Sequence, residues 1–139
     1  MFDSLLQMYR TIDKFATIES IAMQYLPIFI LLVAVYVLGN GILHDVFVLM
    51  QHKEPYDRNL LRLLMDGHIL ISSGIAYIIA YFLLRQNNPI GLYLCIATAL
   101  SLLVYCGMIF PFLKSYGIIA ITVVVLGWTL VNLLFYHPK

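Results

Sequence analysis

Four long apolar runs dominate this sequence and limit what the chain can fold into. They cover residues 26–50, 63–84, 90–113 and 116–136. As an α-helix rising about 1.5 Å per residue, each run is long enough to cross a hydrocarbon core of about 30 Å. None of the runs alternates polar and apolar residues as an outer-membrane strand does, and a helix pairs its backbone polar groups within itself. The runs therefore predict an all-α integral membrane protein with four transmembrane helices.

The composition agrees with burial in a lipid bilayer. Of the 139 residues, 63% are hydrophobic and 11% are charged, whereas a soluble domain has about 45–50% apolar and about 25% charged residues. Eight Lys and Arg residues nearly balance seven Asp and Glu residues, so there is no basic face for a nucleic acid and we expect no such partner. Two cysteines are too few for a disulfide scaffold. The partner that this composition indicates is the bilayer.

The breaks between the runs are short and polar. Residues 51–59 read QHKEPYDRN and residues 85–89 read RQNNP, and each segment contains a proline that disfavours a continuing helix. Lys114 and Ser115 make the last turn. Connections this short make consecutive helices antiparallel neighbours. We therefore predict an up-down-up-down four-helix bundle over residues 26–139.

The first 25 residues have a different pattern. Apolar residues recur at steps of three and four with polar residues mostly between them, which is typical of an amphipathic helix. The apolar positions are Phe2, Leu5, Leu6, Tyr9, Ile12 and Ala16. We predict that residues 1–25 form a helix lying along the membrane surface, with packing against a partner protein as the alternative. The segment lacks the basic start, apolar stretch and small-residue cleavage site of a secretory signal.

Ionisable groups inside the apolar runs are the main candidates for function, because each is costly in lipid unless it is paired or hydrated. Four residues qualify, namely His44, Asp45, Asp66 and His68. In an antiparallel hairpin all four fall in one layer, on the side of residues 51–59. Since Asp66 and His68 are two residues apart on one helix, they point in different directions, and at most three of the four side chains can meet.

Three interpretations of this layer stay open. His44 and His68 could face each other with Asp45 or Asp66 orienting an imidazole, which suits proton or ion passage in a small oligomeric transporter or channel. The same histidine pair suits ligation of haem or a divalent metal in a membrane-anchor subunit of a redox enzyme. The third interpretation is structural, with the four groups pairing between helices. We predict no cofactor.

Other polar residues accompany the layer along the same helix faces or at the same height. They are Asn40, Arg62, Ser72, Ser73 and Tyr105. Arg62 precedes Asp66 by four residues and is therefore placed to pair with it. Arg58 and Arg62 are also candidates to bind a lipid phosphate or another anionic head group.

The Lys and Arg residues do not set an orientation in the membrane. Alternating helices would place Arg10, Lys14, Arg85 and Lys139 on one side, and Lys53, Arg58, Arg62 and Lys114 on the other. The two sides are equal, so the positive-inside bias is absent. Dual topology, and an orientation set by another subunit, both stay open.

The small share of the sequence outside the four apolar runs indicates the functional class of the protein. Four spans with so little sequence outside them leave little room for a soluble active site, so an enzyme is not expected. We predict a non-catalytic subunit or oligomeric component of a larger membrane assembly, associated with copies of itself or with other membrane subunits. A chain with two cysteines and no presequence fits the bacterial inner (cytoplasmic) membrane best.

Overall fold

The computed structural model describes residues 2–53, 57–111 and 115–134, and these residues form four α-helices. The helices are α1 (Phe2–Gln51), α2 (Arg58–Arg85), α3 (Ile90–Ile109) and α4 (Tyr116–Leu134). All four contain a segment that is long and apolar enough to cross a membrane. The prediction of an all-α chain with four such helices is confirmed.

Local hydrogen bonds explain where α2 and α3 begin. Asp57 caps α2, because its Oδ1 accepts a 2.7 Å hydrogen bond from the Leu60 backbone N–H, which has no partner within the helix. After α2, Asn87 takes a left-handed conformation with φ of 54°, which asparagine tolerates well. Asn88 Oδ1 then accepts a 3.0 Å hydrogen bond from the Ile90 N–H at the start of α3. The polar turn predicted at residues 85–89 is therefore confirmed.

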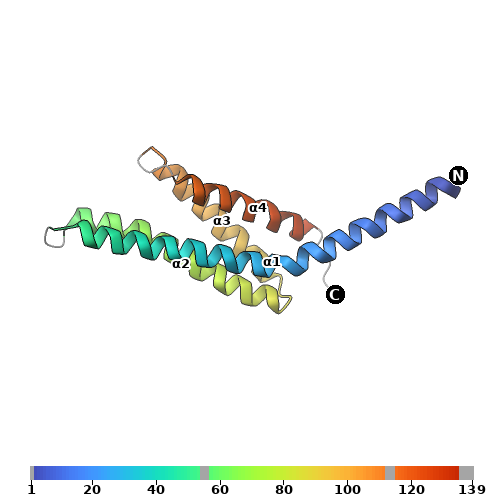
Figure 1. Cartoon of the computed structure of the whole chain (residues 1–139), viewed down its shortest axis with the longest axis horizontal. Coiled ribbons are helices and arrows are strands. Elements are labelled where there is room, and N and C mark those ends of the chain that lie inside the picture. Colours follow the sequence, from blue (N-terminus) through green and yellow to red (C-terminus); the bar gives the residue numbers. More distant parts are fainter. Residues whose placement is uncertain (1, 54–56, 112–114, 135–139) are drawn as a thin grey trace.

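The helices pack in a ring. α2 contacts α1 and α3, and α4 contacts α3 and α1. Consecutive helices run in opposite directions (Figure 1). The two hairpins, α1–α2 and α3–α4, lie close together near the α2–α3 turn and diverge toward the other end of the molecule (Figure 1).

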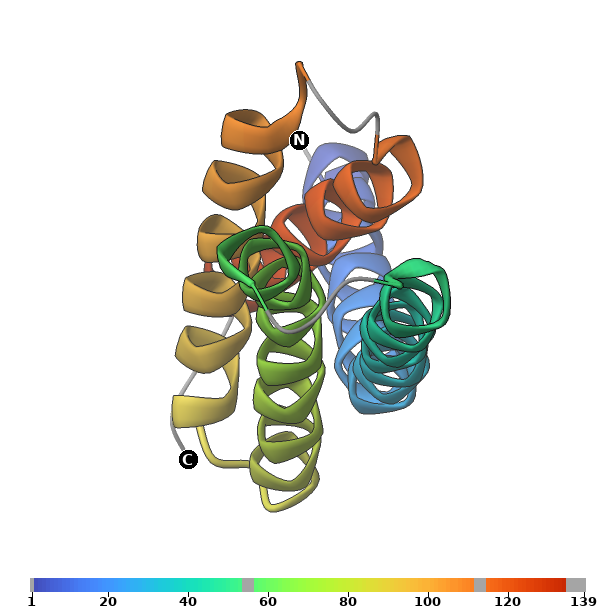
Figure 2. The same ribbon diagram turned by 90° about the vertical axis from the view of Figure 1, so that its left-hand side faces the viewer.

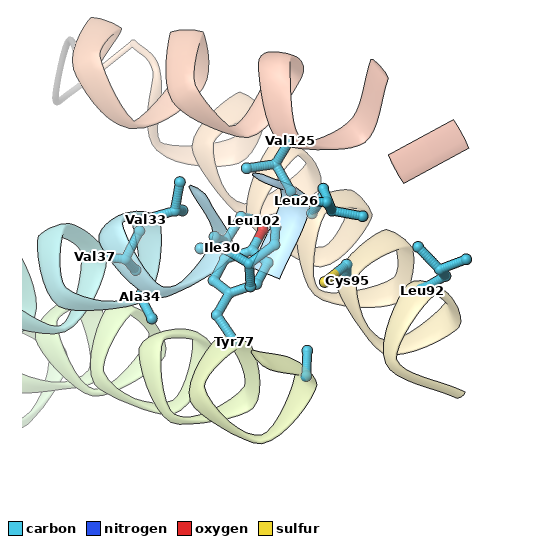
Figure 3. Packing of buried hydrophobic residues seen from close by; sticks show 12 residues of the cluster. Leu26, Ile30, Val33, Ala34, Val37, Tyr77, Leu92, Cys95, Leu102 and Val125 are labelled. Carbon is cyan, nitrogen blue, oxygen red and sulfur yellow. The ribbon is translucent and has the colours of Figure 1, made fainter. Parts of the chain in front are cut away.

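The apolar core fills the half of the bundle next to the α2–α3 turn. It contains Leu26, Ile30, Val33, Ala34 and Val37 of α1, Tyr77 and Ala80 of α2, Leu92, Cys95, Ala99 and Leu102 of α3, and Val125 of α4. Figure 3 shows these side chains gathered between the four helices. Cys95 and Cys106 are both buried and unbonded. The hydroxyl of the buried Thr122 on α4 is not left unpaired, since its Oγ1 donates a 2.6 Å hydrogen bond to the carbonyl of Ile118.

α1 is longer than the sequence indicated. It continues without a break from Phe2 to Gln51 and includes Pro27. Its first part runs on beyond the bundle (Figure 1). The amphipathic segment is therefore the extension of the first apolar helix and not a separate helix ending at residue 25. Its place along a membrane surface stays a prediction.

Candidate functional site

Asp45 lies at the contact between α1 and α2, in the half of the molecule away from the core. Its Oδ2 is 3.1 Å from His68 Nδ1, and its Oδ1 is 3.5 Å from His44 Nδ1. Only 13% of its side chain is exposed. The structure thus brings three of the four ionisable residues together, in a row in which the carboxylate separates the two imidazoles.

Two glycines allow the helices to approach at this point. A Cβ atom on Gly67 would overlap the carboxylate of Asp45 and would lie 2.9 Å from the carbonyl of Gly41. A Cβ on Gly41 would in turn lie 2.8 Å from the carbonyl of Gly67. The Asp45 carboxylate therefore occupies the space that any other residue at position 67 would fill.

These two glycines were not predicted from the sequence as part of the site. A glycine inside a helix costs about 0.5–1 kcal/mol relative to alanine, so its presence there needs a reason. Gly67 stands between Asp66 and His68, and Gly41 lies one turn before Asp45. A glycine within one turn of each pair of ionisable residues is the sequence signal that would have indicated close helix packing at the site.

His68 is oriented by two acceptors. Its Nδ1 lies 3.1 Å from Asp45 Oδ2 and 3.0 Å from the Leu64 carbonyl oxygen. Because both neighbours accept hydrogen bonds, Nδ1 carries the proton and Nε2 is left for another partner. The side chain is 71% exposed and lines a groove of about 490 Å³ on the outer face of α2, together with Ser72. His68 therefore presents one nitrogen outward from the bundle.

His44 lines a different groove, between α1 and the start of α4. Its Nδ1 and the Asp45 Oδ1 are both buried and have no hydrogen-bond partner in the described part of the chain, so their 3.5 Å contact is electrostatic. The two histidines, His44 and His68, thus line separate grooves. Among the described residues, no group of three or more His, Cys, Asp and Glu side chains is arranged to hold a metal ion.

Asp66 points away from this row and toward α3. Its carboxylate lies beside the Tyr105 hydroxyl, although that hydroxyl is buried without a hydrogen bond of normal geometry. The expected pair of Arg62 with Asp66 is not formed, since each ion pair among the described residues involves a histidine and none includes Arg62. The orientation of α2 about its own axis thus directs His68 toward α1 and Asp66 toward α3, and separates Asp66 from the other three residues.

The remaining predicted residues lie around the row. Asn40 donates a 2.7 Å hydrogen bond from Nδ2 to the Tyr36 carbonyl on its own helix. Ser73 is buried, whereas Arg58 and Arg62 are exposed at the start of α2. Binding of a lipid phosphate by these two arginines stays a prediction.

An ion pair that was not predicted from the sequence lies at the first connection. His52 Nε2 lies 3.7 Å from Asp57 Oδ1. The same carboxylate oxygen caps α2, so this contact links the end of α1 to the beginning of α2.

No protein-family model, no curated protein and no solved structure matches this chain.

Proposed function

We propose that this protein is a non-catalytic, membrane-embedded component of a larger assembly, formed with copies of itself or with other membrane proteins. The observation that carries the proposal is the length of α1. The helix has 50 residues, whereas about 20 suffice to cross a hydrocarbon core. Its first part extends beyond the bundle (Figure 1). We call residues 2–23 the N-terminal arm.

A helical arm of this length needs a surface to pack on. An isolated helix is only marginally stable in water, because most helical stability in proteins comes from packing of an apolar face. The sequence gives the arm such a face, with Leu5, Tyr9 and Ile12 on one stripe. The rest of the bundle does not reach along the arm (Figure 1). A neighbouring subunit that packs against this stripe would supply the missing contact.

The opposite end of the α1–α2 hairpin supports the same proposal. Phe47 lines the same groove as Tyr116 at the start of α4, so the remaining four residues of α1, up to Gln51, extend about 6 Å past that start. Large apolar side chains are exposed near this end of the hairpin, namely Val46, Phe47, Leu49, Met50, Leu61, Leu63 and Met65. α3 and α4, with 20 and 19 residues, already suffice for a core of about 30 Å. The protruding tip therefore offers a second apolar surface to a partner.

The proposal is tested with a charge placed on the arm. In Leu5→Glu the charge falls on the apolar stripe, whereas in the matched control Gln7→Glu it falls between stripe positions. Each protein is extracted from membranes in a mild detergent, and its mass and stoichiometric partners are determined by native mass spectrometry. We expect wild type and Gln7→Glu to remain in a multi-chain complex and Leu5→Glu to leave it. A monomeric wild-type protein, or equal assembly of both variants, contradicts the proposal.

A second function, proton passage, is favoured by the row of His44, Asp45 and His68. Imidazole and carboxylate groups at 3.1 and 3.5 Å form a chain along which a proton can move between the two grooves. The core half of the bundle is filled by apolar side chains, so a path through the whole membrane would continue along a second chain. This function also requires an oligomer.

Two isosteric variants test proton passage. Asp45→Asn removes the charge at the centre of the row, and Asp66→Asn removes a charge that faces Tyr105 instead. In liposomes containing a pH-sensitive dye, we expect proton influx to disappear with Asp45→Asn and to persist with Asp66→Asn. Equal fluxes in the two variants would exclude the row as the proton path.

A further inference from the structure

A groove separates the last third of α1 from the start of α4, and we call it the α1–α4 groove. Its volume is about 580 Å³, which is in the range of small-molecule sites. α1 contributes Tyr36, Asn40 and His44, and Ser115 and Tyr116 come from the start of α4. Figure 2 views the molecule from this end and shows the start of α4 standing apart from the end of α1. The groove therefore combines five polar side chains from two helices.

The polar groups of the α1–α4 groove keep free hydrogen-bonding capacity. Asn40 uses one N–H on the Tyr36 carbonyl, which leaves its Oδ1 and a second N–H. His44 directs Nδ1 at Asp45, so Nε2 is the ring nitrogen left for a ligand. The Tyr36 hydroxyl lies against Gly117, where a Cβ would come within 2.8 Å of it. Glycine at position 117 thus keeps this part of the groove open.

The lining of the groove selects the chemistry of its ligand. Besides the polar groups it contains Leu43, Phe47, Leu70 and Ile118. Hydroxyl and amide donors satisfy neutral carbonyl oxygens. The aromatic side chains Tyr36, Phe47 and Tyr116 provide flat surfaces for a ring. This combination suits a neutral, flat ring with carbonyl oxygens.

We propose that the α1–α4 groove binds a membrane-soluble quinone. The ring carbonyls accept hydrogen bonds from Asn40 and Ser115, and the ring packs against Phe47. The apolar tail leaves the groove between α1 and α4 into the lipid. The groove lies beside the first turn of α4, close to a helix end, where the polar head of an amphiphile meets the membrane boundary. The proposal concerns binding alone and does not depend on the assembly proposed above.

The test is a titration of the full chain with a ubiquinone that carries a single isoprene unit. The protein is purified in detergent, freed of endogenous lipid, and titrated while quenching of its tyrosine and tryptophan fluorescence is followed. We expect saturable binding of one quinone per chain. Asn40→Leu should raise the Kd about tenfold, which corresponds to the loss of one hydrogen bond.

The control variant is Ser101→Ala. Ser101 is exposed on α3 and lines a different groove, so its replacement should leave the Kd unchanged. If Asn40→Leu does not yield folded protein, Ser115→Ala replaces it, because Ser115 precedes the first turn of α4 and its loss should raise the Kd several-fold.

Three outcomes would overturn the proposal. They are the absence of saturable quinone binding to the wild-type protein, the same Kd for the groove variants as for Ser101→Ala, and displacement of the quinone by an equal concentration of phosphatidylglycerol. The last result would mean that the groove accepts charged lipid head groups as readily as a neutral ring.

Discussion

At the scale of single residues, the site depends on a carboxylate and the glycine opposite it. Asp45 is held between two imidazoles, and the absence of a side chain at Gly67 makes room for its oxygens. The sequence alone identified the ionisable residues and the limit of three that could meet. It did not identify which aspartate would join the histidines, because this choice depends on the rotation of α2, which the Gly41–Gly67 contact fixes.

This contact gives a prediction about glycine substitutions. Gly67→Ala places a methyl group on the Asp45 carboxylate, so α2 must move away from α1 or Asp45 must leave its position. Overpacking of this kind costs about 1–3 kcal/mol. We expect Gly67→Ala to lower the free energy of unfolding by that amount, measured by SDS-induced unfolding in mixed micelles.

Gly39→Ala is the matched control, since a Cβ at Gly39 meets no atom within 4 Å. The same added methyl group should there stabilise α1 slightly, by up to about 1 kcal/mol, through helix propensity alone. Equal changes in the two variants would show that the close contact at Gly67 has no energetic role.

At the scale of helices, the apolar runs located every element, and the differences lie at the ends. α2 begins at Arg58, before the run at residue 63, because Asp57 caps it and charged residues are tolerated in its first turns. α3 ends at Ile109, four residues before its run does. Phe110 still has helical φ and ψ, but Pro111, two residues after Ile109, has no backbone N–H and so cannot continue the hydrogen bonds of the helix.

The first helix shows a difference of another kind between the sequence pattern and the structure. The boundary at residue 25 was placed where the hydrophobic pattern changes from amphipathic to continuous apolar. Such a change reports a new environment for the side chains and is not a signal that stops a helix. Pro27 can be accommodated within a helix, and α1 passes through it. Residues 2–51 therefore form one helix across two kinds of sequence.

At the scale of the whole molecule, the bundle is divided into a packed half and an open half. Most of the core cluster lies in the half next to the α2–α3 turn, whereas the His44–Asp45–His68 row and the α1–α4 groove lie in the half where the hairpins diverge. The sequence did not predict this division. Apolar periodicity shows that a helix is buried or in lipid, but it does not show how far two hairpins separate along their length.

The division predicts where the stability of the molecule resides. Leu102 is fully buried in the core, and Leu100, on the same helix, is 49% exposed. In a detergent micelle the surroundings of the protein are apolar, so truncating a leucine costs little transfer energy, and the cavity left in the core becomes the main loss. We expect Leu102→Ala to lower the free energy of unfolding by about 2 kcal/mol or more, and Leu100→Ala by less than about 0.5 kcal/mol. SDS-induced unfolding of the two variants in the same micelles measures the difference. Similar losses would mean that the α3 face at Leu100 is also packed, against a second chain retained in the detergent.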